Sequence, residues 1–391
     1  MPSHVTPHRV GAGVLLLVVA LSRADAPAHD ASAWGGLFRT RDAGATWLHV
    51  NPASFVSAAL AVAVSPVDPH HLLLATDTGV SRSRNGGRDW VIEARDVLVG
   101  PGFAVTFDVD GQRALVAGAS ALFRGDGDRW SPLRLPAGSI PARALVSGSV
   151  AGRVYLAGWG GLHRSDDWGA SWINVGDGIR AEYAASVVVP PSHPEHVYVL
   201  AGGRFWVSID AGRSWQLRSD GLPASGIEVV AVDPSDANRL WSVATGQVFR
   251  TDDQGQRWRP IGASVPDKPV VARAVAVVDD VILMATDRGV HRSADGGQRW
   301  ELSSDNLPAH VGAGLLVRDP LNPATVYAGF ALTSHEELLR RAGEGGSPLG
   351  RLDLVDVAGG LAFLALLFIA AGLTVRRVAR SHYRVPRAAP R

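Results

Sequence analysis

The stretch Ser293-Ala294-Asp295-Gly296-Gly297-Gln298-Arg299-Trp300 is one copy of a turn that recurs along this chain of 391 residues. Its pattern is a hydroxyl residue, any residue, Asp, any residue, Gly, two further residues and Trp. Four other copies fit the whole pattern, one has Asn85 at the Asp position, and a worn copy is two residues short. We refer to all of them as the repeated turns: Thr40–Trp47, Ser83–Trp90, Phe123–Trp130, Ser165–Trp172, Ser208–Trp215, Thr251–Trp258 and Ser293–Trp300.

The tryptophans that end the repeated turns are spaced 43, 40, 42, 43, 43 and 42 residues apart. A spacing this regular, repeated this often, indicates a modular array. Each unit also contains four short strand signals, which in the second unit cover residues 58–65, 71–76, 80–83 and 89–94;. The repeated turn joins the third strand to the fourth. Four strands in a unit of this length are typical of a β-propeller blade.

The two ends of the array fit together. The first strand signal, Trp34–Phe38, has the character of a third strand, whereas residues 312–318 and 325–330 correspond to first and second strands. The last two strands therefore need the first two to complete a blade, which leaves no open sheet edge. The sequence predicts an all-β, seven-bladed β-propeller over residues 34–333, closed by strands shared between its two ends.

The residues of the repeated turn suit a self-contained structural role. A short Asp side chain accepts hydrogen bonds from its own turn, Gly takes a positive φ, and Trp buries a large ring. We assign this role to Asp42, Trp47, Asn85, Trp90, Asp167, Trp172, Asp210, Trp215, Asp253, Trp258, Asp295 and Trp300. The pattern lacks the further oxygen ligands that calcium requires, so we expect no metal and no cofactor.

Most repeated turns carry an arginine directly before the hydroxyl residue, as Arg292 does before Ser293. Because a residue needed once for chemistry does not recur at the same position of every blade, we interpret these arginines as structural. A ring of arginines that binds anionic partners is the alternative.

Composition excludes some classes of function. The formal net charge of +1 gives no strong field for nucleic acid, so no nucleic-acid partner is expected;. The chain has no cysteine, which excludes disulfides, thiolate nucleophiles and thiolate metal sites;.

The N-terminus has the features of a secretory signal. An apolar stretch from Val10 to Leu21 precedes Ala24-Asp25-Ala26, which fits an A-x-A cleavage site;. We predict a signal peptide over residues 1–26, with an uncleaved anchor as the alternative.

The C-terminus contains a second apolar segment. Val357–Val375 carries no charge and, at about 1.5 Å per residue, is long enough to cross a bilayer;. We predict a stalk over residues 334–353, in which His335–Ala342 can form a short helix, a transmembrane helix over 354–375 and a basic cytoplasmic tail over 376–391. A buried core helix is the alternative. The basic tail predicts a single-pass type I topology with the propeller on the extracytoplasmic side.

With these motifs the chain resembles the BNR or Asp-box repeat propellers, over Trp34 to Phe330. The form of the copy at Gly289–Trp300 is most similar to the photosystem II assembly factor family, the sortilin ectodomain and uncharacterised bacterial proteins. For sortilin-type receptors the resemblance implies a ten-bladed ring followed by cysteine-rich modules, and this chain has seven units and no cysteine. The assembly-factor family matches in blade count, export and absence of catalysis.

The resemblance implies a non-catalytic, membrane-anchored scaffold that binds a protein partner. A sortilin-like peptide-binding receptor and a glycoside hydrolase of the sialidase type are the alternatives. A sialidase site would need arginines on different blades, a Tyr beside a Glu, and an acid/base carboxylate. By analogy with other propellers, the candidates lie on the face where the innermost strands begin: Glu182, Tyr183, Glu228, Arg143 and Arg273. Adjacent strand residues point to opposite faces, so Glu182 and Tyr183 can share a pocket only at a bulge.

Overall fold

The computed structural model describes residues 35–51, 56–136, 139, 141–179, 184–266, 270–308 and 311–343. The predicted signal peptide, the predicted transmembrane helix and its basic tail lie outside these residues, as do Glu182 and Tyr183. Within the described ranges, the structure contains no helix long and apolar enough to cross a membrane.

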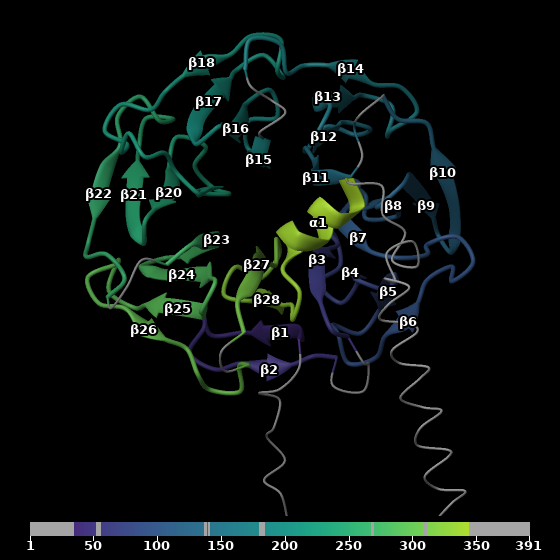
Figure 1. Ribbon diagram of the computed structural model, residues 1–391, viewed down its shortest axis with the longest axis horizontal. Coiled ribbons are helices and arrows are strands. Elements are labelled where there is room, and N and C mark those ends of the chain that lie inside the picture. Colours follow the sequence, from purple (N-terminus) through teal and green to yellow (C-terminus); the bar gives the residue numbers. More distant parts are fainter. Residues whose placement is uncertain are drawn as a thin grey trace, which may run out of the picture.

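The described strands form seven four-stranded antiparallel sheets around a central axis, which is the predicted seven-bladed propeller (Figure 1). In each blade the first strand of the unit is innermost and the fourth is outermost. Blades 1 to 3 comprise β3 (Ala59–Val64), β4 (Leu72–Thr76), β5 (Val80–Ser83) and β6 (Val91–Ile92); β7 (Gly102–Phe107), β8 (Arg113–Gly118), β9 (Leu122–Asp126) and β10 (Arg129–Leu133); and β11 (Ala142–Ser147), β12 (Val154–Gly158), β13 (Gly161–Ser165) and β14 (Ile173–Asn174).

Blades 4 to 6 repeat this order further along the chain. They comprise β15 (Ala184–Val188), β16 (Val197–Ala201), β17 (Arg204–Ser208) and β18 (Gln216–Leu217); β19 (Val229–Val232), β20 (Leu240–Ala244), β21 (Gln247–Thr251) and β22 (Arg259–Ile261); and β23 (Ala272–Val278), β24 (Val281–Thr286), β25 (Gly289–Ser293) and β26 (Glu301–Leu302). The outermost strand of blade 1 is shorter than the predicted strand over residues 89–94. In blade 1 the fourth strand covers Val91–Ile92 alone, because the repeated turn extends through Trp90.

Blade 7 is built from both ends of the array, as predicted. It contains β27 (Ala313–Arg318) and β28 (Val326–Phe330) followed by β1 (Gly36–Thr40) and β2 (Leu48–His49). The register between β1 and β28 runs from Gly36 opposite Phe330 to Thr40 opposite Val326 without a break. This continuous ladder closes the ring.

The apolar core is divided into layers between neighbouring blades. Blades 6 and 7, for example, share a cluster that contains Leu283, Val290, Phe38 and Phe330. The six other pairs of neighbouring blades have similar clusters among the described residues. Because each blade buries its two faces against its neighbours, the propeller is stabilised by blade-to-blade packing.

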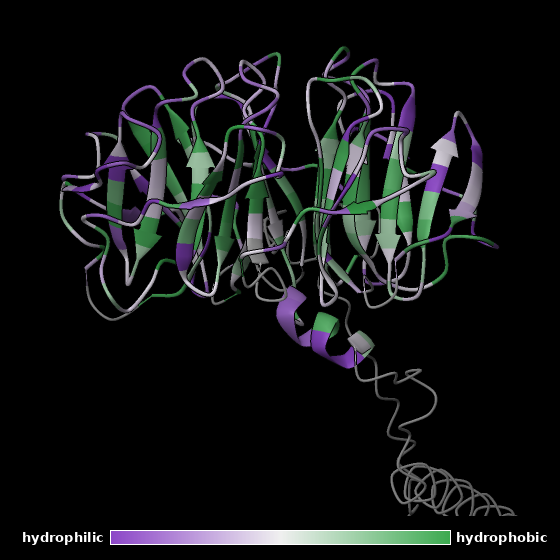
Figure 2. Cartoon of the chain, turned by 90° about the horizontal axis from the view of Figure 1, so that it is seen from above, coloured by the Kyte–Doolittle hydropathy of each residue, from purple (hydrophilic) through white to green (hydrophobic). Residues whose placement is uncertain are grey.

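The chain leaves the propeller through a short helix, α1 (His335–Gly343), which lies over the centre of the ring in Figure 1. Ser334 caps it, because its hydroxyl accepts a hydrogen bond from the Glu337 amide at 3.3 Å;. Figure 2 shows α1 on one face of the disc. We call this the α1 face; it is the face where the innermost strands begin. The opposite face carries the repeated turns, and we call it the turn face.

Candidate functional site

The innermost strands share an irregularity where they begin on the α1 face. In six of the seven described inner strands the register slips near the first residue, so one residue has no opposite partner. This is the geometry of a β-bulge. The bulges occupy equivalent positions in their blades, so their residues surround the central axis as a bulge ring: Leu60, Phe103, Arg143, Ala185, Arg273 and Gly314.

Helix α1 packs against one side of the bulge ring. Leu339 is 2% exposed and contacts Leu60 and Phe103 in one apolar cluster. His335 donates a hydrogen bond from Nε2 to the Phe103 carbonyl at 3.1 Å, and the two rings meet edge to face with centroids 5.6 Å apart. The far end of the helix, Gly343, lies against the Trp159 ring. The helix is therefore held at both ends and in the middle.

Burial lowers the pKa of His335 below its ordinary value of about 6.5;. Arg143 and Arg273 lower the pKa further, whereas the bond to the Phe103 carbonyl and the nearby Glu336 act in the opposite direction. The neutral imidazole is thus the form favoured at this buried position, where α1 meets the propeller.

The bulge ring also carries two of the predicted arginines, Arg143 beside the C-terminal end of α1 and Arg273 on blade 6. The Arg143 guanidinium stacks over Trp159, with its carbon 5.5 Å from the ring centroid. The Arg273 guanidinium lies over Gly312, where an added Cβ would come within 2.9 Å of Nη1. Within the described part of the chain, neither arginine has a carboxylate partner. The structure therefore places both arginines on the same ring, as a sialidase-type site would require, but pairs neither with an acid of the ranges that it describes.

Glu228, the described carboxylate candidate, links two blades. Its Oε1 accepts a hydrogen bond from the Thr245 amide at 3.0 Å, and its Oε2 accepts one from the Ala272 amide at 2.5 Å. Thr245 belongs to blade 5 and Ala272 begins the inner strand of blade 6. A carboxylate held by backbone amides on both oxygens is suited to joining blades. Glu182 and Tyr183, the other acid and its neighbour, are outside the described residues.

The repeated turns make the local hydrogen bonds that their residues suggest. In the first copy, Thr40 donates to Asp42 at 2.7 Å, Asp42 accepts from the Thr46 amide at 2.9 Å, and the Gly44 amide donates to Thr40 at 2.8 Å. Partial burial alone would raise the pKa of Asp42, but the bonds from Thr40 and Thr46 lower it to about 2. Gly44 has φ +84°, and a Cβ there would lie within 2.5 Å of Leu283 in blade 6.

The prediction that the turn is self-contained is wrong, because it also joins neighbouring blades. The arginine before the hydroxyl residue donates to a turn carbonyl of the next blade, as Arg39 does to Gly86 at 2.5 Å and Arg164 to Ala211 at 2.7 Å. The turn tryptophan donates in the other direction, as Trp215 does to the Val175 carbonyl at 2.7 Å. These bonds support the structural interpretation of the recurring arginines.

The worn repeated turn is compensated by a buried polar network between blades 1 and 2. Arg82 pairs with Glu93 at 2.7 Å, contacts His71 at 2.7 Å and donates to the Gly127 carbonyl at 3.0 Å. Glu93 also accepts the Trp130 indole N–H at 2.7 Å. Burial, followed by the Arg82 charge, lowers the pKa of His71 to about 4. The network holds Trp130 where the short turn cannot.

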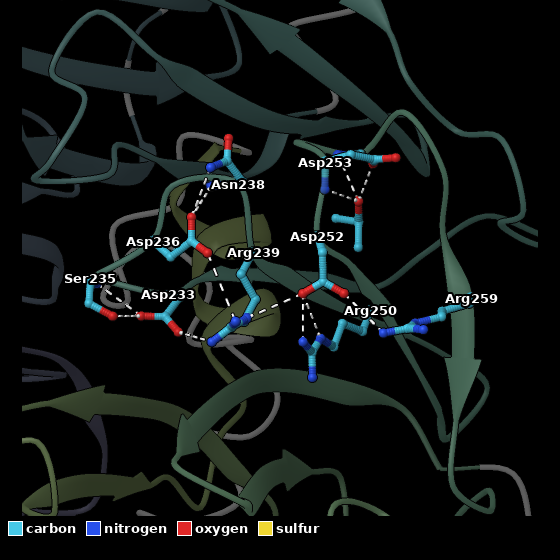
Figure 3. A network of polar contacts seen from close by, with 11 residues as sticks. Asp233, Ser235, Asp236, Asn238, Arg239, Arg250, Asp252, Asp253 and Arg259 are labelled. Atoms are coloured by element: carbon cyan, nitrogen blue, oxygen red, sulfur yellow. Dashed lines mark hydrogen bonds and ion pairs between the residues drawn. The ribbon is translucent and has the colours of Figure 1, made fainter.

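Blade 5 carries an ion-pair network on the turn face (Figure 3). Asp252 pairs with Arg250 at 2.6 Å, Arg259 at 3.0 Å and Arg239 at 3.3 Å, and Arg239 also reaches Asp233 at 3.4 Å. Partial burial raises the pKa of Asp252, but the bond from Arg250 and the neighbouring charges more than offset it. Asp236 lies 3.9 Å from Arg239, so three aspartates face three arginines in this network. The partly exposed network fastens the repeated turn to the loop between β19 and β20.

Sequence reasoning missed Trp159, Phe103 and Leu339. Trp159 had a usable signal, because it lies in the hairpin Gly158-Trp-Gly-Gly161, where the corresponding turns of other blades hold small or polar residues. Phe103 and Leu339 had none, because each looks like an ordinary core residue until α1 is placed.

Comparison with known proteins identifies the fold. No family model matches the chain, and no curated protein matches its sequence. The structure is similar to the GH74 xyloglucanase from Xanthomonas campestris, with a TM-score of 0.57 and 22% identity, over 73% of this chain and 55% of the xyloglucanase. It is also similar to YCF48 from Cyanidioschyzon merolae, with a TM-score of 0.56 and 16% identity, over 73% of this chain and 99% of YCF48. A structure of YCF48 bound to D1 peptide gives a TM-score of 0.53 and 17% identity, over 71% of this chain and 95% of that protein.

These neighbours are seven-bladed propellers, and at such identities they show the fold alone;. The chain spans about half the length of the xyloglucanase and nearly all of YCF48.

Proposed function

We propose that this chain is a non-catalytic, membrane-anchored extracytoplasmic scaffold whose propeller binds a protein partner. The proposal rests on which groups lie on the bulge ring and on how those groups are paired. Helix α1 covers one side of the ring, and among the described residues no carboxylate pairs with the two arginines of the ring, Arg143 and Arg273. Glu228 is engaged by two backbone amides. The described residues thus offer surfaces and anchors for binding and no assembled acid/base pair.

The similarity to YCF48 supports a binding role for a propeller of this kind, because YCF48 has been solved with a D1 peptide. The anchoring part of the proposal rests on the sequence: a signal peptide over residues 1–26, a transmembrane helix over 354–375 and a basic tail;. Together these give a type I protein with its propeller outside the cytoplasm.

Affinity capture of the tagged full-length chain from detergent-solubilised membranes tests the binding role. We expect one or a few membrane proteins to be enriched in proportion to the bait. A bait that keeps the predicted signal peptide and residues 334–391 but lacks the propeller serves as the control, since a specific partner should be lost with the propeller. Recovery of the same proteins with both baits, or of none, would contradict the proposal.

The fold-level similarity to a xyloglucanase makes a glycoside hydrolase the second candidate. Fluorogenic glycosides, including a sialoside, test it with the purified full chain and with Glu182→Gln and Glu228→Gln. We expect no turnover above a blank. Turnover that either substitution abolishes would establish catalysis and remove the scaffold proposal.

A further inference from the structure

The place where the chain leaves the propeller fixes which face is closest to the predicted span. The described chain ends at Gly343, on the α1 face and beside Trp159. Residues 344–356 separate it from the uncharged segment Val357–Val375. A random coil of this length has an end-to-end distance of about 20 Å, and full extension gives about 45 Å at most.

Only the α1 face is within easy reach of a bilayer that this linker enters. The inner strands alone give the disc a thickness of roughly 20 Å, at about 3.3 Å per residue. To bring the turn face against the bilayer, the linker would have to pass over half the α1 face and then down the rim. That path needs nearly full extension, which few conformations of a coil provide.

The α1 face also presents suitable side chains. Trp159 is 48% exposed at the tip of a hairpin, Val99 is 74% exposed in the loop before β7, and Val271 and Leu332 are 55% and 52% exposed. They come from four different blades, so they contact a flat surface together rather than one groove. Trp159 lies under the Arg143 guanidinium, and a tryptophan paired with an arginine suits the boundary between lipid and water;.

Exposed apolar residues alone do not show which face lies against the membrane, because the turn face also exposes Val67, Ile209 and Leu321. The position at which the chain leaves the propeller indicates the α1 face. We propose that the α1 face rests on the membrane surface, with Trp159, Val99, Val271 and Leu332 in contact with the lipid headgroup region. This inference rests on the predicted span of the proposed function. It leaves the turn face and the outer strands open to a protein partner.

The absence of cysteine permits a direct test, because one introduced cysteine is the only thiol in the chain. Val271 on the α1 face and Val67 on the turn face form a matched pair, at 55% and 56% exposure. Full-length Val271→Cys and Val67→Cys are each labelled with a fluorophore and reconstituted into phosphatidylcholine–phosphatidylglycerol liposomes. Lipids with a nitroxide on the headgroup then act as the quencher. Either orientation of the protein places its α1 face at a labelled leaflet.

We expect the label at position 271 to be quenched several-fold more than the label at position 67. A further substitution, Trp159→Ser, should reduce the quenching at 271 without releasing the protein from the liposomes. Equal quenching at the two positions, or stronger quenching at 67, in protein that floats with the liposomes would overturn the orientation while the span stands. Protein that fails to float would overturn both the span and the orientation.

Discussion

The two faces of the disc differ in how much of each repeats. On the turn face the same hydrogen bonds recur from blade to blade, as in the Asp42 and Asp210 turns. On the α1 face the equivalent bulge positions differ in size and charge, from Gly314 and Leu60 to Phe103 and the two arginines, Arg143 and Arg273. The repeated contacts are those that every blade needs in order to fold. Positions that differ from blade to blade are free to serve a function particular to one blade.

The largest expected effect comes from the place where the turn face stops repeating. Glu93→Ala removes the carboxylate that pairs with buried Arg82 and accepts the Trp130 indole, so Arg82 is left unpaired between blades 1 and 2. We expect the free energy of unfolding to fall by about 3–5 kcal/mol. Chemical denaturation measures it. Glu93→Gln keeps two polar atoms at the site and should cost less; equal losses would show that the carboxylate charge carries the whole effect and that the remaining polar atoms contribute nothing.

Leu339→Ala tests the α1 face in the same way. The substitution removes the buried anchor of α1 from its contacts with Leu60 and Phe103. A buried Leu→Ala change costs about 2–5 kcal/mol, and a nine-residue helix is not stable without tertiary contacts;. We expect α1 to become sensitive to protease while the thermal unfolding of the blades stays unchanged. The exposed Arg341→Ala is the control. A fall in the melting temperature of the whole propeller would contradict this division.

The sequence predicts the repeated part well and the unrepeated part poorly. Period, residue chemistry and the phase of the two ends were enough for seven blades and for closure between β1 and β28. They could not place His335, because its partner Phe103 is 232 residues away and no pattern connects them. Nor could they show that Glu228 is held by amides of two different blades. Such contacts depend on how the elements pack, which a periodic signal does not encode.

A single repeated turn should matter less than the buried network. Asp210→Ala removes bonds from Ser208, Ser214 and the Ser214 amide. These bonds are partly exposed, so we expect a loss of about 1 kcal/mol in the free energy of unfolding. Asp210→Asn should cost less, because the natural Asn85 accepts the equivalent bond from the Asp89 amide at 2.9 Å. Calorimetry of the three proteins ranks them; an Asn variant as unstable as the Ala variant would refute the comparison.

Acidification should destabilise α1 at a higher pH than the repeated turns. Hydrogen bonds hold the pKa of Asp42 and Asp210 at about 2, against the ordinary 3.8. A lowered carboxyl pKa contributes stability above pH 3.8, and this contribution is lost as the pH falls towards 2. The turns should therefore stay intact at pH 5.

The smallest effect concerns His335, whose pKa is lowered by burial. A lowered histidine pKa stabilises the docked helix at pH values above about 6.5 and ceases to do so as the pH falls below it. After correction for the intrinsic pH dependence of amide exchange, we expect protection in α1 to fall between pH 7 and pH 5, with protection in the repeated turns unchanged. His335→Gln should abolish this dependence. Exchange that rises equally in both regions would contradict it.

Hydrogen–deuterium exchange of the full-length chain in detergent and in liposomes tests the central claim most directly. If the unrepeated α1 face meets the membrane and the repeated turns only hold the ring, liposomes should slow exchange in α1, in the loop before β7 that contains Val99 and in the Trp159 hairpin. The amides of the repeated turns should exchange at the same rate in both. Slower exchange in the repeated turns, or identical exchange everywhere, would contradict the account.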